Sequence, residues 1–275
     1  MTATDPAPNA RPARLHATRP TMRLATPRTV AALILREMST TYGRSPGGYV
    51  WLILEPILGI ALLSAVFSLG FRNPRLGTNF PMFYATGMLP FLCYMDVSTR
   101  VSQAINYSRQ LLNYPRVTFV DTLLARFALG ALTQLLVALV ILTGIRAIWD
   151  TRTIVAMDQI VLAYAMVLAI AAGVGILNCF LVTSFPVWQR VWSIVNRPLF
   201  FLSGIILLLE SVPEPYRSVL WFNPLIHPVG EMRAAFYLEY EATYVSPAYV
   251  FGVSLTMAVI GLLFLRQYHR DIMER

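Results

Sequence analysis

The stretch REMSTTYGRSPGGYVWLILEPILGIALLSAVFSL, residues 36–69, joins a charged segment directly to a segment that is apolar enough to cross a bilayer. The Ser-Pro-Gly-Gly run at 45–48 interrupts any helix, because proline lacks a backbone N–H and glycine favours turns. Residues 49–69 are then almost entirely apolar, and about 20 such residues in a helix span the hydrocarbon core. The stretch therefore predicts a membrane helix that follows a polar segment without a linker.

The composition of the chain also indicates an integral membrane protein. Of its 275 residues, 56% are hydrophobic and 13% are charged, and the mean hydropathy is +0.58. Soluble domains carry about 25% charged residues. All 22 basic residues are arginines, and most of them flank apolar segments. The net charge of +8 therefore comes largely from arginines that can set the orientation of the chain in the membrane, and it does not indicate nucleic-acid binding.

The absence of lysine excludes one class of activity. A Walker A loop uses a lysine to reach the terminal phosphates of ATP, and this chain has no lysine. The sequence also contains no GxSxG, HExxH or CxxC motif, and Cys93 and Cys179 lie in apolar runs. His227 and Glu231 alone are too few ligands for a metal site. We therefore expect no catalytic, metal or cofactor site in this chain.

Six apolar segments are candidate membrane helices. They cover residues 49–69, 82–105, 118–143, 158–182, 192–209 and 248–265. The second becomes polar after Met95 and the fifth is short, whereas the other four are clear. An even number of spans places both termini on one side, and arginines are more frequent on that side, which the positive-inside rule assigns to the cytoplasm. The expected fold is an all-α integral membrane protein with six transmembrane helices.

Two segments lie outside these spans. Residues 1–27 are rich in Pro, Ala, Thr and Arg and lack the apolar run of a signal peptide, so we expect a disordered cytoplasmic tail. Residues 210–247 are rich in acids and prolines, with apolar pieces too short to span. These pieces suit helices that lie at the interface or re-enter the membrane where protein or water covers the backbone.

The second span carries polar residues at helical spacing. Asp96, Thr99, Arg100, Gln103 and Tyr107 would lie on one face of a helix, and Asp96 precedes Arg100 by four residues, the favourable order for an ion pair. A charge at the bilayer centre costs about 2.5–3.5 kcal/mol, so such residues usually face protein or a water-filled path. The stripe predicts either a hydrated conduit or structural pairs near the cytoplasmic interface, where arginine can snorkel.

Two further charged residues extend this prediction. Arg126 lies within the third span, and Glu55 lies within the first, followed by Pro56, which can kink the helix. Glu55 suits either the cytoplasmic mouth of a conduit or a structural pair with an arginine. The predicted conduit residues are Glu55, Asp96, Arg100, Gln103 and Arg126.

Four motifs resemble ABC-2 type permeases for bacterial polysaccharides, especially the capsular polysaccharide exporters. They are REMSTTYGRSPGGYVWLILEP (36–56), GMLPF (87–91), LLNYPRVTFVDTLLAR (111–126) and NPLIHPVGEMR (223–233). They occur in the order found in that family, and the resemblance covers residues 28–275. It implies that this range is an ABC-2 type transmembrane domain.

The resemblance also implies the function and the partners. Such a permease would be a homodimer in the bacterial inner membrane, with two separate ABC ATPase subunits that bind ATP and Mg. It would export a lipid-linked capsular polysaccharide and contact membrane lipids and a periplasmic polysaccharide co-polymerase or adaptor. It would not be an enzyme in its own right and would not bind nucleic acid.

Roles for particular residues follow from the same resemblance. Residues 28–44 would form an amphipathic helix on the cytoplasmic surface, and residues 106–118 would form a coupling helix on the ATPase. The implied coupling residues are Arg36, Glu37, Arg109, Asn113, Tyr114 and Arg116. The implied residues of the periplasmic gate helices are Trp221, Asn223, Pro224, His227 and Glu231. The sequence HPVGE at 227–231 departs from the family, because Pro228 and Gly230 should weaken a continuous second gate helix.

Three alternatives remain open at this point. An O-antigen or teichoic-acid exporter would share the architecture. A membrane-embedded transferase acting on lipid-linked sugars would need acids or histidines clustered at the membrane surface, and only residues 210–241 supply candidates. An ion-coupled transporter would be expected to contain inverted repeats, and the sequence shows none.

Overall fold

The computed structural model describes residues 25–41, 48–112, 117–151 and 153–274, and the regular structure in these ranges is helical. The elements are α1 (Ala25–Thr41), α2 (Gly48–Gly70), α3 (Phe80–Ser102), α4 (Ala104–Leu112), α5 (Phe119–Ile148), α6 (Met157–Ser184), α7 (Trp188–Leu202), η2 (Leu209–Ser211), α8 (Tyr216–Trp221), α9 (Ile226–Ala234) and α10 (Pro247–Glu274). The predicted all-α class is confirmed.

Within the described ranges, four helices are long and apolar enough to cross a membrane. They are Val50–Gly70 in α2, Phe119–Ile148, Met157–Ser184 and Pro247–Tyr268 in α10. These are the four segments that the sequence marks most clearly. The second and fifth predicted spans form α3 and α7, but α3 has a polar second half and α7 has 15 residues, so neither meets the same criteria.

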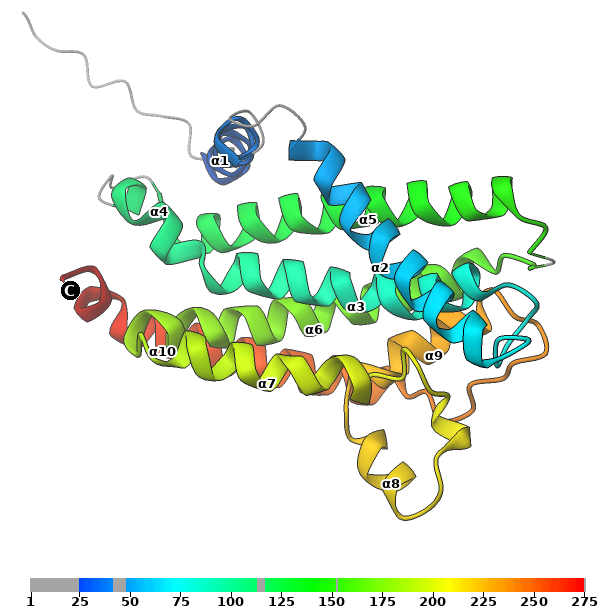
Figure 1. Ribbon diagram of the computed structural model, residues 1–275. Helices are drawn as coiled ribbons and strands as arrows, with labels where there is room; N and C mark the ends of the chain where they lie inside the picture. Colours follow the sequence, from blue (N-terminus) through cyan, green and yellow to red (C-terminus); the bar gives the residue numbers. More distant parts are fainter. Residues whose placement is uncertain (1–24, 42–47, 113–116, 152, 275) are drawn as a thin grey trace, which may run out of the picture.

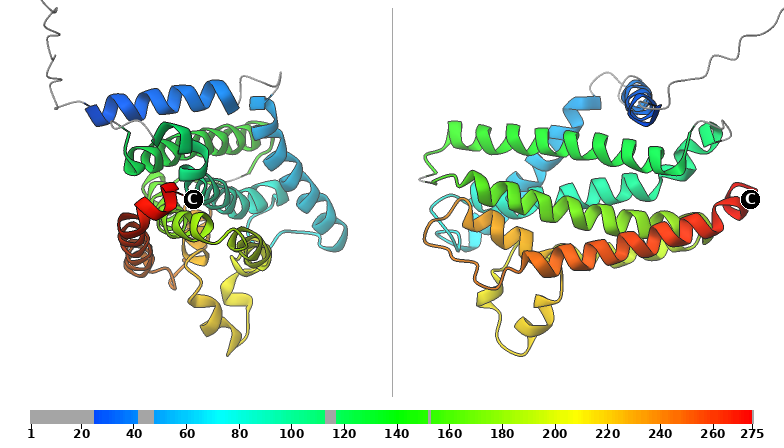
Figure 2. Two further views of the ribbon diagram at one scale, coloured as in Figure 1. Left: turned by 90° about the vertical axis from the view of Figure 1, so that its left-hand side faces the viewer. Right: turned by 180° about the vertical axis from the view of Figure 1, so that it is seen from behind.

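The long helices run side by side, and α3 lies at the centre of the packing. Helix α3 packs against α5 and α6, and α6 packs along α10, while α2 crosses the bundle obliquely (Figure 1). Helix α1 lies across one end of the bundle, which it shares with α4 and the C-terminal part of α10 (Figure 2). Helices α8 and α9 lie at the opposite end. We call these the α1 end and the α9 end.

Glycines allow α6 and α10 to approach closely. A Cβ on Gly261 of α10 would lie 2.7 Å from the backbone nitrogen of Leu177, and a Cβ on Gly173 of α6 would clash with the backbone of Ser254. Small residues at such contacts let helix backbones pack tightly where lipid removes the hydrophobic drive for association. A larger side chain at either position would push the two helices apart.

The sequence predicted that the polar stripe lies on one continuous helix, but in the structure the stripe is divided between two helices. Helix α3 ends at Ser102, and Gln103 leaves the helical geometry with φ −96° and ψ 7°. Tyr107 therefore belongs to α4, which turns away from the axis of α3 (Figure 1). The carbonyl of Gln103 accepts a hydrogen bond from the backbone N–H of Tyr107 at 3.0 Å and another from Arg126 Nη1 at 3.5 Å, so a side chain of α5 also contacts the break.

The expectation of a weakened helix at Pro228 and Gly230 is wrong. Both residues lie in α9, which runs from Ile226 to Ala234 without interruption. Pro228 is in the first turn, where its missing N–H would have no helical partner in any case. Gly230 is buried against the ring of Tyr244, and a Cβ there would clash with the Tyr244 hydroxyl. This glycine makes room for a neighbour and does not end the helix.

Candidate functional site

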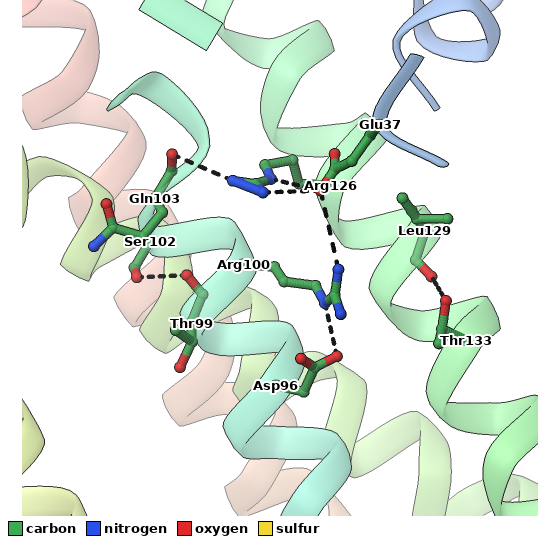
Figure 3. Close-up of polar contacts among 9 residues, drawn as sticks. All are labelled: Glu37, Asp96, Thr99, Arg100, Ser102, Gln103, Arg126, Leu129 and Thr133. Carbon is green, nitrogen blue, oxygen red and sulfur yellow. Dashed lines mark hydrogen bonds and ion pairs between the residues drawn. The ribbon is translucent and has the colours of Figure 1, made fainter. Parts of the chain in front are cut away.

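Glu37 of α1 lies between two arginines of the bundle (Figure 3). Its Oε1 accepts hydrogen bonds from Arg126 Nη2 at 2.8 Å and from Arg126 Nε at 3.1 Å, and it lies 4.0 Å from Arg100 Nη1. Arg100 Nε in turn donates to Asp96 Oδ2 at 2.7 Å, which confirms the predicted i,i+4 pair. We call Glu37, Asp96, Arg100 and Arg126 the Glu37 cluster.

Arg126 connects this cluster to a fourth helix. Its guanidinium lies 4.2 Å from the ring centroid of Tyr107 in α4, a cation–π contact, and its Nη1 reaches the carbonyl of Gln103. A planar guanidinium has several fixed donors, so one arginine can hold several groups in defined directions. Through Arg126 and its partners, α1, α3, α4 and α5 are joined at one point.

The Glu37–Arg126 pair of the cluster is buried, and the charges of the cluster balance. Glu37 is 3% exposed and Arg126 is 8% exposed. Its two acids face two arginines, so each charge has an opposite partner within the cluster. Removing one member of such a pair leaves an uncompensated buried charge, which is strongly destabilising. The arrangement is therefore suited to holding α1 in a fixed place on the bundle.

The start of α5 is also fixed, and this positions Arg126. The Thr118 hydroxyl accepts a hydrogen bond from the backbone N–H of Asp121 at 3.2 Å, and Asp121 Oδ2 accepts one from the backbone N–H of Thr118 at 3.0 Å. This reciprocal capping box satisfies two backbone donors that a helix start otherwise leaves unpaired. Arg126 follows on the same helix, so the cap helps to define where its guanidinium lies.

The remaining polar residues of α3 face a different neighbour. In Figure 3 the side chains of Thr99 and Gln103 point away from Arg100. Both line a cavity between α3 and α7. The predicted stripe is thus divided between two sides of α3, with Asp96 and Arg100 toward α1 and α5.

Glu55 is not part of the Glu37 cluster. Its side chain is exposed on α2, whereas Pro56 beside it is buried. Among the described residues Glu55 makes neither an ion pair nor a hydrogen bond through its side chain, so the intrachain pair with an arginine that the sequence left open does not form there. The structure places this carboxylate on the outer surface of the single chain.

Six residues were implied to couple the chain to an ATPase, and those that the structure describes lie at the α1 end. Arg36 and Arg109 are exposed on α1 and α4, and Glu37 is buried beside them in its cluster. Asn113, Tyr114 and Arg116 lie outside the described residues. Exposed arginines on two neighbouring elements offer a cationic surface at this end of the bundle.

The residues implied to form a gate lie at the α9 end, around His227. His227 is buried; its Nε2 donates to the carbonyl of Trp221 at 3.1 Å, and its Nδ1 accepts from the backbone N–H of Ser246 at 3.3 Å. The rings of Trp221, Tyr244 and Tyr249 surround it. Burial lowers the pKa of His227 below 6.5, so the imidazole is neutral at pH 7.

The turn between α8 and α9 is held by Asn223 and Pro224. The Asn223 side chain donates to the carbonyl of Leu202 at 3.0 Å and accepts from the backbone N–H of Leu225 at 3.1 Å, which forms an Asx-type turn. Glu231 lies further along α9, where burial and then the nearby Asp158 raise its pKa. It does not bond to His227, although the two are four residues apart.

One buried group at this end was missed in the sequence. Arg233 is 1% exposed; its Nη2 donates to the carbonyl of Ile205 at 2.7 Å, and its guanidinium lies 4.4 Å from the ring centroid of Phe83. Nearby, the Tyr240 hydroxyl donates to the carboxylate of Glu210 at 3.0 Å. No burial or role of its own was predicted for Arg233 from the sequence. Its position inside the apolar run MRAAFYL was the available sign of burial.

Comparisons of the sequence with known proteins identify a family and several relatives. The family model for the ABC-2 type transporter matches residues 28–237. The polysialic acid transport protein KpsM of Escherichia coli is 32% identical over 238 residues, which cover 86% of this chain and 92% of that protein. The capsule polysaccharide export inner-membrane proteins CtrC of Neisseria meningitidis serogroup A and BexB of Haemophilus influenzae are 24% and 26% identical, each over 89% of this chain and 92% of their own.

Proposed function

This chain belongs to the ABC-2 type transporter family, and from that premise we propose that it is the permease of an ATP-driven exporter of lipid-linked capsule polysaccharide in the bacterial inner membrane. The observation that carries the proposal is the 32% identity with a polysialic acid transport protein over nearly the full length of both chains. The capsule export proteins of two further organisms support the same substrate class. The chain has no lysine for a Walker A loop, so separate ATPase subunits would bind ATP and Mg.

We propose six spans, with α3 and α7 added to the four clearly apolar helices. Both run alongside the apolar helices (Figure 1), and α3 packs between α5 and α6, where most of its side chains are buried and Arg100 pairs with Asp96. The proposed transmembrane domain is 28–275, and residues 1–27 are a cytoplasmic tail. The α1 end faces the cytoplasm, with α1 along the membrane surface and both termini on that side, and α8 and α9 are short gate or re-entrant helices on the periplasmic side.

The proposed assembly contains two copies of this chain, two ATPase subunits and a periplasmic co-polymerase or adaptor. The support for a second copy is the outer face of α2, where Glu55 is exposed among apolar neighbours such as Trp51 and Leu58. A carboxylate facing lipid is costly, so we place it toward the partner copy or a water-filled path between the two. It remains our candidate for the cytoplasmic mouth of the conduit.

We propose that the Glu37 cluster transmits motion from the ATPase to the bundle. Arg36 and Arg109 lie on α1 and α4, the two elements that face the ATPase in this proposal. Arg126 binds Glu37 of α1 and contacts Tyr107 of α4, so a displacement of either element acts on α5. Arg100 connects the same carboxylate to α3. The burial of Arg126 favours this transmitting role over direct contact with the polysaccharide.

At the α9 end, the ring cluster around His227 would form the movable gate. Trp221 of α8 is tied to the segment before α10 by its indole N–H, which donates to the carbonyl of Tyr244 at 2.9 Å. Asn223 fixes the turn to the end of α7. A motion of α7 or α10 would therefore shift α8 and α9 together.

The test is reconstitution of the full-length chain with its ATPase in vesicles that contain lipid-linked capsule polysaccharide. ATP should drive the polysaccharide to the far leaflet, and a partner ATPase whose Walker A lysine is replaced should not support this movement. A folded, ATP-hydrolysing complex that moves no capsule polysaccharide contradicts the proposal. Movement of an O-antigen or teichoic acid in its place identifies the related exporter.

A further inference from the structure

We propose that the cavity between α3 and α7 binds the sugar–phosphate end of the lipid-linked glycan, close to the α1 end of the bundle. This inference rests on the proposed function, because it names where the substrate of that transporter is held. The cavity has a volume of about 370 Å³, within the usual range for pockets that hold small ligands. We call it the α3–α7 cavity.

The position of the cavity suits a substrate that enters from the α1 end. Its α3 residues, from Phe91 to Gln103, belong to the half of α3 that leads into α4. Its α7 residues run from Gln189 to Phe200. Helix α7 and this half of α3 lie toward the α1 end of the bundle (Figure 1), so the cavity that they line is on the side of the proposed ATPase.

A buried amide in the cavity lacks a partner within the chain. Asn196 is 6% exposed, and its Oδ1 has no hydrogen-bond partner among the described residues. A buried amide oxygen without a donor is costly, and native proteins usually satisfy such groups with protein, ordered water or a ligand. The hydroxyl groups of a sugar are suitable donors. Asn196 thus marks the cavity as a place for a hydroxyl-bearing ligand.

Other side chains around Asn196 fit the same ligand. Thr99 and Gln103 of α3 and Ser193 of α7 add hydroxyl and amide groups to the lining. Trp192 provides an indole ring, whose flat apolar face with one polar edge suits contact with a sugar ring. Such a mixture of hydrogen-bonding groups and an aromatic face suits a glycan better than a purely apolar lipid tail.

One cationic side chain, that of Arg197, also lines the cavity. Arg197 is exposed beside Asn196, and within the described part of the chain it forms no ion pair with an acid. No aspartate or glutamate lines the cavity. A guanidinium binds phosphate oxygens through paired N–H donors. Arg197 can therefore hold the phosphate that links a sugar to its lipid, while Asn196 and Trp192 contact the sugar.

The test measures equilibrium binding of three radiolabelled probes to the full-length chain with its ATPase in nanodiscs. The probes are dodecyl maltoside, dodecyl phosphate and the dodecyl phosphodiester of maltose. Wild type should bind the phosphodiester most tightly, because only this probe offers both the sugar and the phosphate. Binding of dodecyl phosphate as tight as that of the phosphodiester would overturn the proposal, since the site would then recognise a lipid phosphate without its sugar.

Two variants test which part of the probe each side chain binds, the phosphate or the sugar. Arg197→Gln should weaken the phosphodiester about tenfold, the effect of losing one charge-assisted hydrogen bond, and leave dodecyl maltoside unchanged. Asn196→Leu should weaken both sugar-containing probes by a similar factor and leave dodecyl phosphate unchanged. Arg190→Gln, on the same helix but outside the cavity, is the matched control and should change none of them. Equal binding by wild type and both cavity variants overturns the inference.

The melting temperature separates a binding defect from a folding defect. Asn196→Leu replaces a buried, unpartnered amide with an apolar side chain of similar size, so the Tm without probe should stay the same or rise. A lower Tm together with weaker binding of all three probes would mean that Asn196 is structural, and the inference would fail. Normal export with unchanged probe binding in the variants rejects this site alone. Absence of export with the predicted probe binding rejects the proposed function alone.

Discussion

Arg126 binds the carboxylate of Glu37, the carbonyl of Gln103 and the ring of Tyr107, so its replacement is the first test of the Glu37 cluster. Arg126→Gln should lower the free energy of unfolding by about 3–5 kcal/mol, because Glu37 would keep a buried charge without its main partner. Arg146→Gln, on the exposed far part of the same helix, should have almost no effect. Thermal unfolding of the purified variants measures both.

The double variant Glu37→Gln/Arg126→Gln distinguishes an ion pair from a packing effect. If the two side chains interact directly, the double variant should lose less stability than the sum of the single variants. Additive losses would mean that the two residues stabilise the fold independently.

His227 should make stability depend on pH at the α9 end. Its pKa in the folded chain is lower than the value of 6.5 expected in the unfolded chain. At a pH between the folded and the unfolded pKa, the unfolded chain binds more protons, so stability falls as the pH falls. Above about pH 6.5 this contribution is constant. Glu231 has the opposite sign, because its raised pKa reduces stability as the pH rises through it.

A comparison of two variants isolates the histidine. In the Glu231→Gln background, the Tm should fall between pH 7.5 and pH 5.5, and adding His227→Gln should remove most of this dependence. An equal fall in both variants would assign the pH dependence to other groups.

At the scale of secondary structure, α9 depends on the close approach of Tyr244 to Gly230. Gly230→Ala places a Cβ against the Tyr244 hydroxyl, and overpacking of this kind typically costs about 1–3 kcal/mol. Adding Tyr244→Phe removes the hydroxyl and should restore part of the loss. Thermal unfolding measures the effect, and Gly252→Ala, where a Cβ meets no neighbour, is the control. An equal loss in the control would contradict this explanation.

The helices illustrate which features the sequence predicts and which it leaves out. The four apolar spans and the Asp96–Arg100 pair follow from hydropathy and from i,i+4 spacing, both of which are local. The end of α3 at Ser102 has no proline or glycine to mark it, so local patterns predicted a longer helix. The bond from Glu37 to Arg126 joins residues 89 positions apart, and no periodicity relates them.

The same limit applies to the α3–α7 cavity. Asn196 and Arg197 were visible in the sequence only as polar residues near the start of a short span. Their significance comes from Thr99 and Gln103, which α3 brings to the same cavity. Such a site depends on which face of each helix meets its neighbour, and this is a property of tertiary packing.

For the whole molecule, the coupling proposal predicts a defect that leaves the fold intact. Arg109→Glu reverses an exposed charge on α4, so it should reduce ATP-driven export about tenfold, the effect of about 1.4 kcal/mol at an interface. Assembly of the proposed permease dimer and its Tm should be unchanged. Export from vesicles and size-exclusion chromatography measure these properties, and Arg72→Gln, exposed near the α9 end, is the control. Normal export by Arg109→Glu would remove α4 from the coupling surface.

The distance in sequence between Glu37 and Arg126 also has a consequence during synthesis. Helix α1 leaves the ribosome before α5, and the arginine that binds its carboxylate is made 89 residues after Glu37. At 5–20 residues per second this delay is on the order of 10 s. During that time α1 has no docking partner in α5, so its association must wait until the later helix has been inserted. A nascent chain that stalls before Arg126 would expose an unanchored α1, which quality-control proteases could recognise as incomplete.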